Sequence, residues 1–279
     1  MSSALAVYHG RFGRVTLYQL DRAMAMHAHR EGHLIFHVQG DEASVRICDA
    51  DHPLTDQLGA AVNPWQPHNF QIPPGAAGAL FLVLYIKPAW FLEAGRSAKS
   101  ALRFGRNGIE VTGQIGRLID LVTNLLVEDT GNPLFTGYLY ELTHECFDQS
   151  WQWMPTGAPM QQTDWCIRDY RVRNSIRFMS SRLGDGIVLD TIARESGLSR
   201  PHFYKLFRQH LRLTPNIYLN TLRMECAIDR LTTSDEAVTA IGLDLGYSSQ
   251  ASFTRFFVSN VGIAPTDYRR VAHLASRHH

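Results

Sequence analysis

Cysteine is scarce in this chain of 279 residues, and the cysteines it has lie far apart. The four are Cys48, Cys146, Cys166 and Cys226, and no two of them form a CxxC pair. This spacing excludes a dense disulfide framework and a zinc knuckle built from paired cysteines. We expect free thiols in a reducing compartment.

Long apolar runs are also missing. The longest, residues 79–86, is too short to cross a bilayer, and the first thirty residues contain Arg11, Arg14 and Asp21 but no uninterrupted apolar core. These absences predict neither a signal peptide nor a membrane anchor. We therefore expect a soluble protein of the cytoplasm.

The chain has little net charge, but its charges are unevenly divided. The formal net charge is +1. Residues 1–160 contain 11 basic and 15 acidic side chains, a net charge of −4, whereas residues 161–279 contain 16 basic and 11 acidic ones, a net charge of +5. Nearly all of the positive charge in the second half is arginine, which suits bidentate contact with phosphate. The length accommodates two domains of ordinary size.

One pattern of apolar and turn residues occurs twice in the basic half. The matching residues are offset by 49 positions as far as the serine and by 50 positions after it. The two sets are Ile192, Gly197, Ser199, Phe203, Phe207, Pro215 and Tyr218, and Ile241, Gly246, Ser248, Phe253, Phe257, Pro265 and Tyr268. Each set predicts a short helix, a tight turn and a second helix. The sequence therefore predicts an all-α domain with tandem helix-turn-helix units.

The turn residues suit this interpretation. Gly197 and Gly246 can adopt the left-handed conformation that a tight turn between helices requires. We expect Ser199 and Ser248 to cap the second helix of their units. A long helix from Pro215 to about residue 231 would join the two units.

The predicted outer faces of the second helices carry side chains that donate hydrogen bonds to phosphates and base edges. They are Arg200, His202, Tyr204, Lys205 and Arg208 in the first unit, and Ser249, Gln250, Thr254 and Arg255 in the second. A solvated helical bundle would also have polar faces, but solvation gives no reason for the duplication. We therefore predict binding to double-stranded DNA.

The first half predicts a different architecture. Short segments rich in β-branched and aromatic residues are separated by glycine, proline and aspartate, which is typical of a sandwich or small barrel. These segments are residues 15–18, 34–38, 44–47 and 80–86. Helical periodicity follows in two stretches, and this helical pair packs on the barrel or joins two copies of the chain.

Four parts are expected along the chain. They are an all-β sensor barrel at residues 1–110, the helical pair at 111–153, a linker at 154–163 and the DNA-binding domain at 164–275. The linker is predicted from Pro155, Gly157 and Pro159 in a stretch without periodicity.

Histidines gather in the first domain. His27 and His29 alternate on a predicted strand and would point the same way, His33 follows, and His68 comes from a separate strand three residues after Trp65. Neutral imidazole is a common ligand of divalent metals. The same side chains would also line a pocket for a small-molecule effector, with Trp65 at its mouth, or serve only the structure. All three interpretations stay open.

Together these features resemble the AraC/XylS family of bacterial transcription regulators. In the second half the resemblance is carried by Ile192, Ala193, Gly197, Leu198, Ser199, Phe203, Leu206, Phe207, Thr214, Pro215, Tyr218, Leu222, Arg223, Ile241, Gly246, Tyr247, Ser248, Ser249, Gln250, Phe253, Arg255, Phe256, Phe257, Gly262, Ala264, Pro265, Tyr268 and Arg269. In the first half, residues 26–29 and 64–68 resemble the cupin-like effector domain common in this family. In metal-binding cupins a His-x-His pair, a glutamate and a later histidine hold the ion, and here His33 stands near the place of the glutamate.

The resemblance implies control of transcription at nearby promoters, a small-molecule effector in the cupin-like domain, RNA polymerase as a partner and a homodimer or a monomer on the nucleoid. It implies base contacts at the positions of Pro201, Tyr204, Lys205, Gln250, Ala251 and Arg255. Since Pro201 and Ala251 have no side-chain donor, base contact shifts to their polar neighbours. Gly242 stands where the family has alanine, at a cost of about 1 kcal/mol in helix propensity.

Two alternatives remain beside a ligand-responsive regulator that is not an enzyme. One is a metal-dependent cupin enzyme fused to a DNA-binding domain, with His27, His29, His33 and His68 as ligands. The missing glutamate argues against it. The other is a β domain that only assembles the protein.

Overall fold

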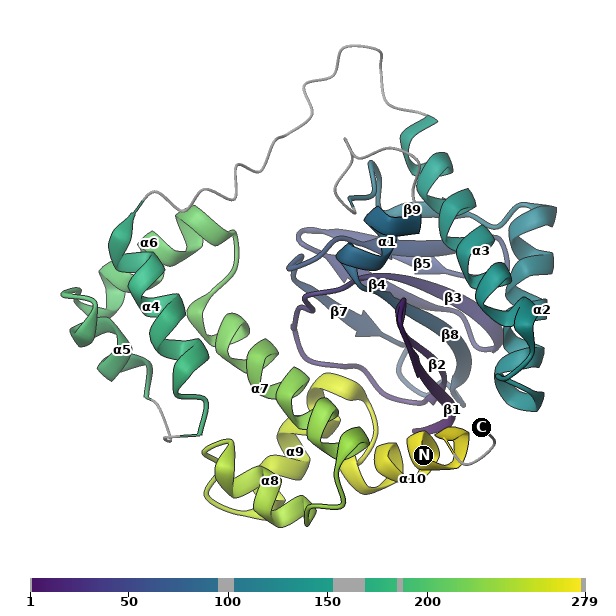
Figure 1. Cartoon of the computed structure of the whole chain (residues 1–279). Helices are drawn as coiled ribbons and strands as arrows, with labels where there is room; N and C mark the ends of the chain where they lie inside the picture. The colour runs from purple at the N-terminus through teal and green to yellow at the C-terminus, as the bar shows by residue number, and fades with distance from the viewer. Residues whose placement is uncertain (1, 95–102, 153–168, 185–187, 277–279) are drawn as a thin grey trace. The chain divides into compact units, whose positions relative to one another are not determined.

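The computed structural model describes residues 2–94, 103–152, 169–184 and 188–276 (Figure 1). The chain forms two compact units. The first contains the β-sheets, the helices that follow them and the last helix of the chain, and the second contains the remaining helices. The predicted linker at residues 154–163 lies outside the described residues.

The first unit is built on two antiparallel sheets. The larger has six strands in the order β1 (Ser3–Gly10), β2 (Gly13–Leu20), β8 (Ala79–Ile86), β3 (Gly32–Gly40), β6 (Leu58–Val62) and β9 (Gly108–Glu110). The smaller has three strands in the order β5 (Ala50–Leu54), β4 (Ala43–Ile47) and β7 (His68–Gln71). The four strands expected from the sequence lie within β2, β3, β4 and β8. The prediction of an N-terminal β domain is confirmed, and its two sheets are antiparallel.

Three helices follow β8, namely α1 (Pro88–Ala94), α2 (Gly113–Glu128) and α3 (Pro133–Gln152), and β9 lies between α1 and α2 in the chain (Figure 1). The side chain of Thr112 caps α2 by accepting a hydrogen bond from the backbone amide of Ile115 at 3.3 Å. The apolar faces of α2 and α3 share one buried core with residues of the large sheet such as Phe36 and Leu84. The helical pair therefore packs on the β-sheet, because its apolar stripe is otherwise left in water.

The last helix, α10 (Pro265–Ser276), belongs to the first unit and packs on β1. Tyr268 on this helix is fully buried, and its hydroxyl accepts a hydrogen bond from Nη1 of Arg14 at 3.4 Å. The sequence had grouped this helix with residues 164–275.

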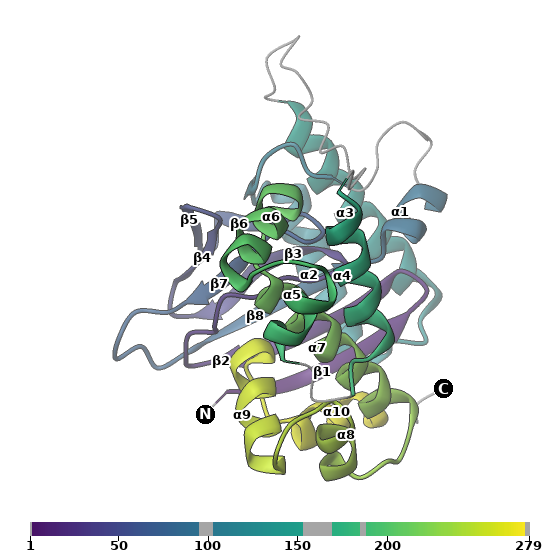
Figure 2. The ribbon, with the colours of Figure 1, turned by 90° about the vertical axis from the view of Figure 1, so that its left-hand side faces the viewer.

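The second unit is helical. Its elements are α4 (Tyr170–Ser181), α5 (Leu189–Glu195), α6 (Arg200–Leu211), α7 (Pro215–Thr233), α8 (Val238–Asp244) and the first part of α9 (Gln250–Val261). In Figures 1 and 2, α4, α5 and α6 lie together near the start of α7, and α8 and α9 lie near its other end. The boundary between the units falls inside α9, after Phe257. The expected C-terminal helical domain is confirmed.

A tight turn joins α5 to α6, and another joins α8 to α9. Gly197 and Gly246 in these turns have φ values of 67° and 85°, in the left-handed region that favours glycine. Ser199 occupies the cap position of α6 but makes no capping hydrogen bond with its side chain. In the second turn Ser249 is the capping residue, because its Oγ accepts from the amide of Ser252 at 3.2 Å. The prediction that Ser248 caps this helix is wrong, since the inserted residue moves the cap by one position.

Gly242 on α8 has a packing role that the sequence did not show. A Cβ atom at this position would lie 2.8 Å from Cβ and 2.9 Å from Cγ of Phe253, closer than carbon atoms can approach. Glycine therefore allows α8 and α9 to touch. This close contact accompanies the cost in helix propensity that the sequence predicts for Gly242.

Candidate functional site

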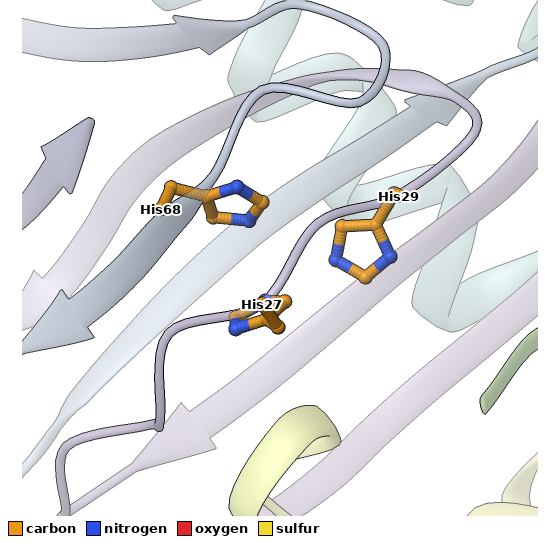
Figure 3. A group of neighbouring side chains, drawn as sticks. All are labelled: His27, His29 and His68. Carbon is orange, nitrogen blue, oxygen red and sulfur yellow. The ribbon is translucent and has the colours of Figure 1, made fainter. Parts of the chain in front are cut away.

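Three buried imidazoles converge in the first unit. His27, His29 and His68 each offer a ring nitrogen, and these three nitrogens all lie within 4.8 Å of one another (Figure 3). The ring centroid of His27 lies 4.3 Å from that of His68 and 5.0 Å from that of His29. None of the three residues is more than 5% exposed. We call this group the histidine cluster.

Two chain segments position the cluster. His27 and His29 lie between β2 and β3 rather than on a named strand, so the strand expected at this pair is wrong. His27 instead forms an isolated antiparallel bridge with His68, the first residue of β7. The amide of Trp65 donates to the carbonyl oxygen of His29 at 2.7 Å, which ties the loop before β7 to the same segment.

Backbone carbonyls determine the tautomers of two cluster residues. Nδ1 of His27 lies 2.7 Å from the carbonyl oxygen of Ala25, and Nδ1 of His68 lies 2.8 Å from that of Gln66. A carbonyl oxygen only accepts, so Nδ1 carries the proton in both rings. Nε2 of each neutral imidazole therefore has a free lone pair. This is the arrangement in which histidine binds metals, with the second ring nitrogen oriented by an outer partner.

Burial keeps these imidazoles neutral. It lowers the pKa of His27 to about 4, against an ordinary value of 6.5, with a smaller contribution from the charge of Arg14. Burial also lowers the pKa of His29 and of His68 well below the ordinary value, and repulsion from neighbouring imidazoles adds to the effect. At neutral pH the cluster presents lone pairs rather than positive charge.

His33 lies beside the cluster, and Tyr85 packs against His33. The His33 ring centroid lies 4.5 Å from that of His68 and 5.0 Å from that of His29, and its Nδ1 is buried without a hydrogen-bond partner. Tyr85 stacks on His33 at 5.3 Å, and the guanidinium carbon of Arg14 lies 3.6 Å from the centre of the Tyr85 ring. His33 thus adjoins the cluster without belonging to the closest group of three.

The polar residues predicted to contact DNA lie on the solvent side of their helices. On α6, Arg200, His202, Lys205 and Arg208 are exposed and Tyr204 is half-buried; on α9 and at its cap, Ser249, Gln250 and Arg255 are exposed and Thr254 is half-buried. The opposite faces bury Phe203, Phe207, Phe253 and Phe257 completely. Each helix therefore has a packed apolar side and a polar side available to a partner.

Local contacts hold some of these polar side chains in place. The guanidinium of Arg200 lies 3.3 Å from the carboxylate of Asp190 and 5.7 Å from the ring centre of Tyr204. Thr239 Oγ1 donates to Oε1 of Gln250 at 2.6 Å, so this hydrogen bond does not use the donors of the Gln250 NH₂ group. A glutamine amide donor and arginine donors are suited to base edges in a major groove.

A model of a helix-turn-helix domain matches residues 192–271. The chain is 30% identical over 109 residues to the probable transcription factor PqrA of Proteus vulgaris, a match that spans 38% of this chain and 89% of PqrA. The chain belongs to the AraC/XylS family of transcriptional regulators.

Two further comparisons extend the likeness to the first unit. The probable transcriptional regulator LumQ of Photobacterium leiognathi is 21% identical over 250 residues, which span 90% of this chain and 94% of LumQ. The solved structure of unsaturated fatty acid bound wild-type ToxT from Vibrio cholerae strain SCE256 has a TM-score of 0.56 at 12% identity and covers 92% of this chain and 94% of ToxT. The likeness to ToxT shows a shared fold. The share of a curated relative's own length that this chain covers differs between relatives, for example 34% in one and 94% in LumQ.

Two residues beside the cluster, Arg14 and Tyr85, were not found by sequence reasoning. Arg14 is only 6% exposed and contacts both Tyr85 and Tyr268. A charged residue at the start of the apolar segment Gly13–Leu20 was the available signal, because a buried arginine needs partners.

Within the described residues, no helix is both long and apolar enough to span a membrane.

Proposed function

We propose that this AraC/XylS member binds DNA sequence-specifically through tandem helix-turn-helix units, with α6 and α9 entering the major groove. The observation that carries the proposal is that both helices bury two phenylalanines on one side and present donors on the other. A net charge of +5 over residues 161–279 favours approach to the phosphate backbone.

The side chains divide into two roles in this proposal. Arg255 and Gln250 on α9, with Arg200 and Lys205 on α6, supply donors for guanine and adenine edges. Arg208 and the neighbouring backbone amides hold phosphates, which sets orientation without reading sequence. Pro201 and Ala251 are exposed but contribute only apolar contact.

The first unit is proposed to be a cupin-like sensor. His27, His29, His33, Trp65 and His68 surround the effector site, and occupancy of that site shifts how the two helix-turn-helix units engage DNA. The ToxT structure named above holds an unsaturated fatty acid, which supports an effector role for this type of N-terminal unit. We further propose that the protein regulates transcription without catalysis, on the nucleoid in the cytoplasm. RNA polymerase and a second copy of the chain are its proposed partners.

Selection of binding sites from a random DNA pool tests the DNA-binding function. The full chain should enrich a defined motif, and a variant with Lys205→Ala and Arg255→Ala should lose that enrichment while it remains folded. Arg46→Ala is the matched control, because Arg46 is an exposed arginine of the first unit paired with Asp51. Equal, weak binding of all sequences by the wild-type chain would contradict the proposal.

A further inference from the structure

We propose that the first unit binds a divalent transition-metal ion through His27, His29 and His68, and that this ion is the effector of the regulator. The inference rests on the proposed regulatory function for the effector role, whereas the metal site stands on the geometry of the cluster alone.

The three histidines of the cluster converge on one point. Three ring nitrogens from two separate chain segments lie within 4.8 Å of one another, in a region where each residue is almost completely buried (Figure 3). The mutual bridge between His27 and His68 holds two of the rings side by side through the backbone. Small movements of the side chains would bring three nitrogens to the bond length of about 2.0–2.1 Å typical of zinc.

Hydrogen bonds to backbone carbonyls orient two of the three rings. The Ala25 and Gln66 carbonyl oxygens take the Nδ1 protons of His27 and His68, so the two Nε2 lone pairs remain for a ligand. Nδ1 of His29 is buried without a hydrogen-bond partner. A buried polar atom without a partner costs free energy, and such an atom in a native structure needs an explanation. A metal ion supplies that explanation for His29.

The ligand type restricts the metal. Imidazole nitrogen suits zinc, copper, iron, cobalt and nickel, whereas magnesium and calcium prefer oxygen. The metal-ligating group found among the described residues contains no carboxylate. Three histidines leave at least one position for water or a further ligand, and His33 lies beside the cluster, with its ring centroid 4.5 Å from that of His68.

The chemistry also separates sensing from catalysis. A metal with a free position lowers the pKa of its bound water by itself, but catalysis also needs a substrate held beside that water. In the proposed role, the bound ion only stabilises one conformation of the segment between β2 and β3. The ion then acts as a ligand that shifts a conformational equilibrium, as any effector with unequal affinity for two states does.

Metal titration of the tag-free full chain tests the site. After removal of metal with chelator, zinc and cobalt are titrated separately, with calorimetry for zinc and visible absorption for cobalt. We expect one equivalent of each ion per chain and a cobalt spectrum typical of nitrogen ligands at low coordination number. Magnesium and calcium should not compete.

Two cluster variants and one control sharpen the test. His29→Ala and His68→Gln should each weaken zinc binding by at least about 100-fold, more than loss of an outer-shell partner usually does. His37→Ala removes a buried histidine of β3 whose partners are Asp56 and the Gly40 carbonyl, so it should keep full affinity. Melting temperatures in chelator establish that each variant is folded before its affinity is compared.

The outcomes separate the two claims. No zinc or cobalt uptake by folded wild-type chain, or unchanged affinity in both cluster variants, overturns the metal site. Metal uptake with the same affinity for the selected DNA motif in zinc and in chelator overturns the effector role. Selection of no DNA motif at all, with metal binding intact, contradicts the proposed function and leaves the metal site standing. A shift of operator affinity by zinc that His29→Ala abolishes supports the whole inference.

Discussion

His27 and His68 bond to each other through both of their backbone amides. The His27 amide donates to the His68 carbonyl oxygen and the His68 amide donates back, both at 2.9 Å, while the ring centroids lie 4.3 Å apart. This pair joins the segment after β2 to the start of β7. Because one backbone bridge holds both residues, a movement of either segment would also move the rings of the cluster.

Acid should destabilise the metal-free protein through this cluster. The pKa of His27 is about 4 in the folded state because of burial, whereas an unfolded histidine titrates near 6.5. The unfolded chain therefore binds the proton first, and stability falls as the pH drops from about 6.5 towards 4. His27 alone should cost about 2 kcal/mol between pH 7.5 and pH 5. Urea unfolding in chelator at both pH values measures the loss.

Matched variants assign the effect. His27→Gln should reduce the difference between the two pH values, whereas His144→Gln, which changes a half-exposed histidine on α3, should leave it unchanged. Equal free energies of unfolding at pH 7.5 and pH 5 in the wild-type chain would show that the cluster is not held neutral.

Arg255→Ala should weaken binding to the selected operator by about 1–3 kcal/mol and relax specificity at one base pair, if Arg255 contacts a base edge. Binding isotherms on the operator and on single-base variants measure both effects. A loss of the same size on every DNA sequence, together with a smaller salt dependence, would instead identify Arg255 as a phosphate contact.

Gly242→Ala should destabilise the second unit despite its better helix propensity. Alanine gains about 1 kcal/mol in a helix interior, but its Cβ would clash with Phe253, and overpacking costs about 1–3 kcal/mol. Gly137→Ala on α3 is the matched control, since no atom lies within 4 Å of the added Cβ. That variant should be neutral or more stable. Thermal unfolding of both compares them, and a raised melting temperature for Gly242→Ala would refute the packing argument.

Tyr268→Phe should destabilise the first unit by about 1–3 kcal/mol, because it removes the hydroxyl that accepts from the buried Arg14. The same hydroxyl lies 3.2 Å from Nε2 of His9. Tyr170→Phe is the control, since Tyr170 is 63% exposed on α4. Chemical denaturation measures both variants, and identical midpoints for Tyr268→Phe and the wild type would show that the contact contributes nothing.

Much of the architecture follows from residue patterns. Spacing alone located α6 and α7, because phenylalanines three to four residues apart and a proline at the first turn are local signals. The strands β1, β5, β6 and β9 were not predicted. β1 and β5 form hairpins with β2 and β4, whereas β6 pairs with β3 and β9, which are more distant in the chain. The sequences of these strands are short or contain polar residues, so they lack the β-branched and aromatic signal on which the prediction relied.

The candidate site likewise combines features that the sequence determines with features that only the tertiary structure decides. The sequence by itself determined the chemistry: four histidines in two segments, and donors on the outer faces of two helices whose apolar stripes must be buried. Tertiary structure decided which histidines come closest, which ring nitrogens the Ala25 and Gln66 carbonyls occupy, and that Arg14 lies under Tyr85. Periodicity reports which face of an element is buried, whereas hydrogen bonds between distant segments depend on how the whole chain packs.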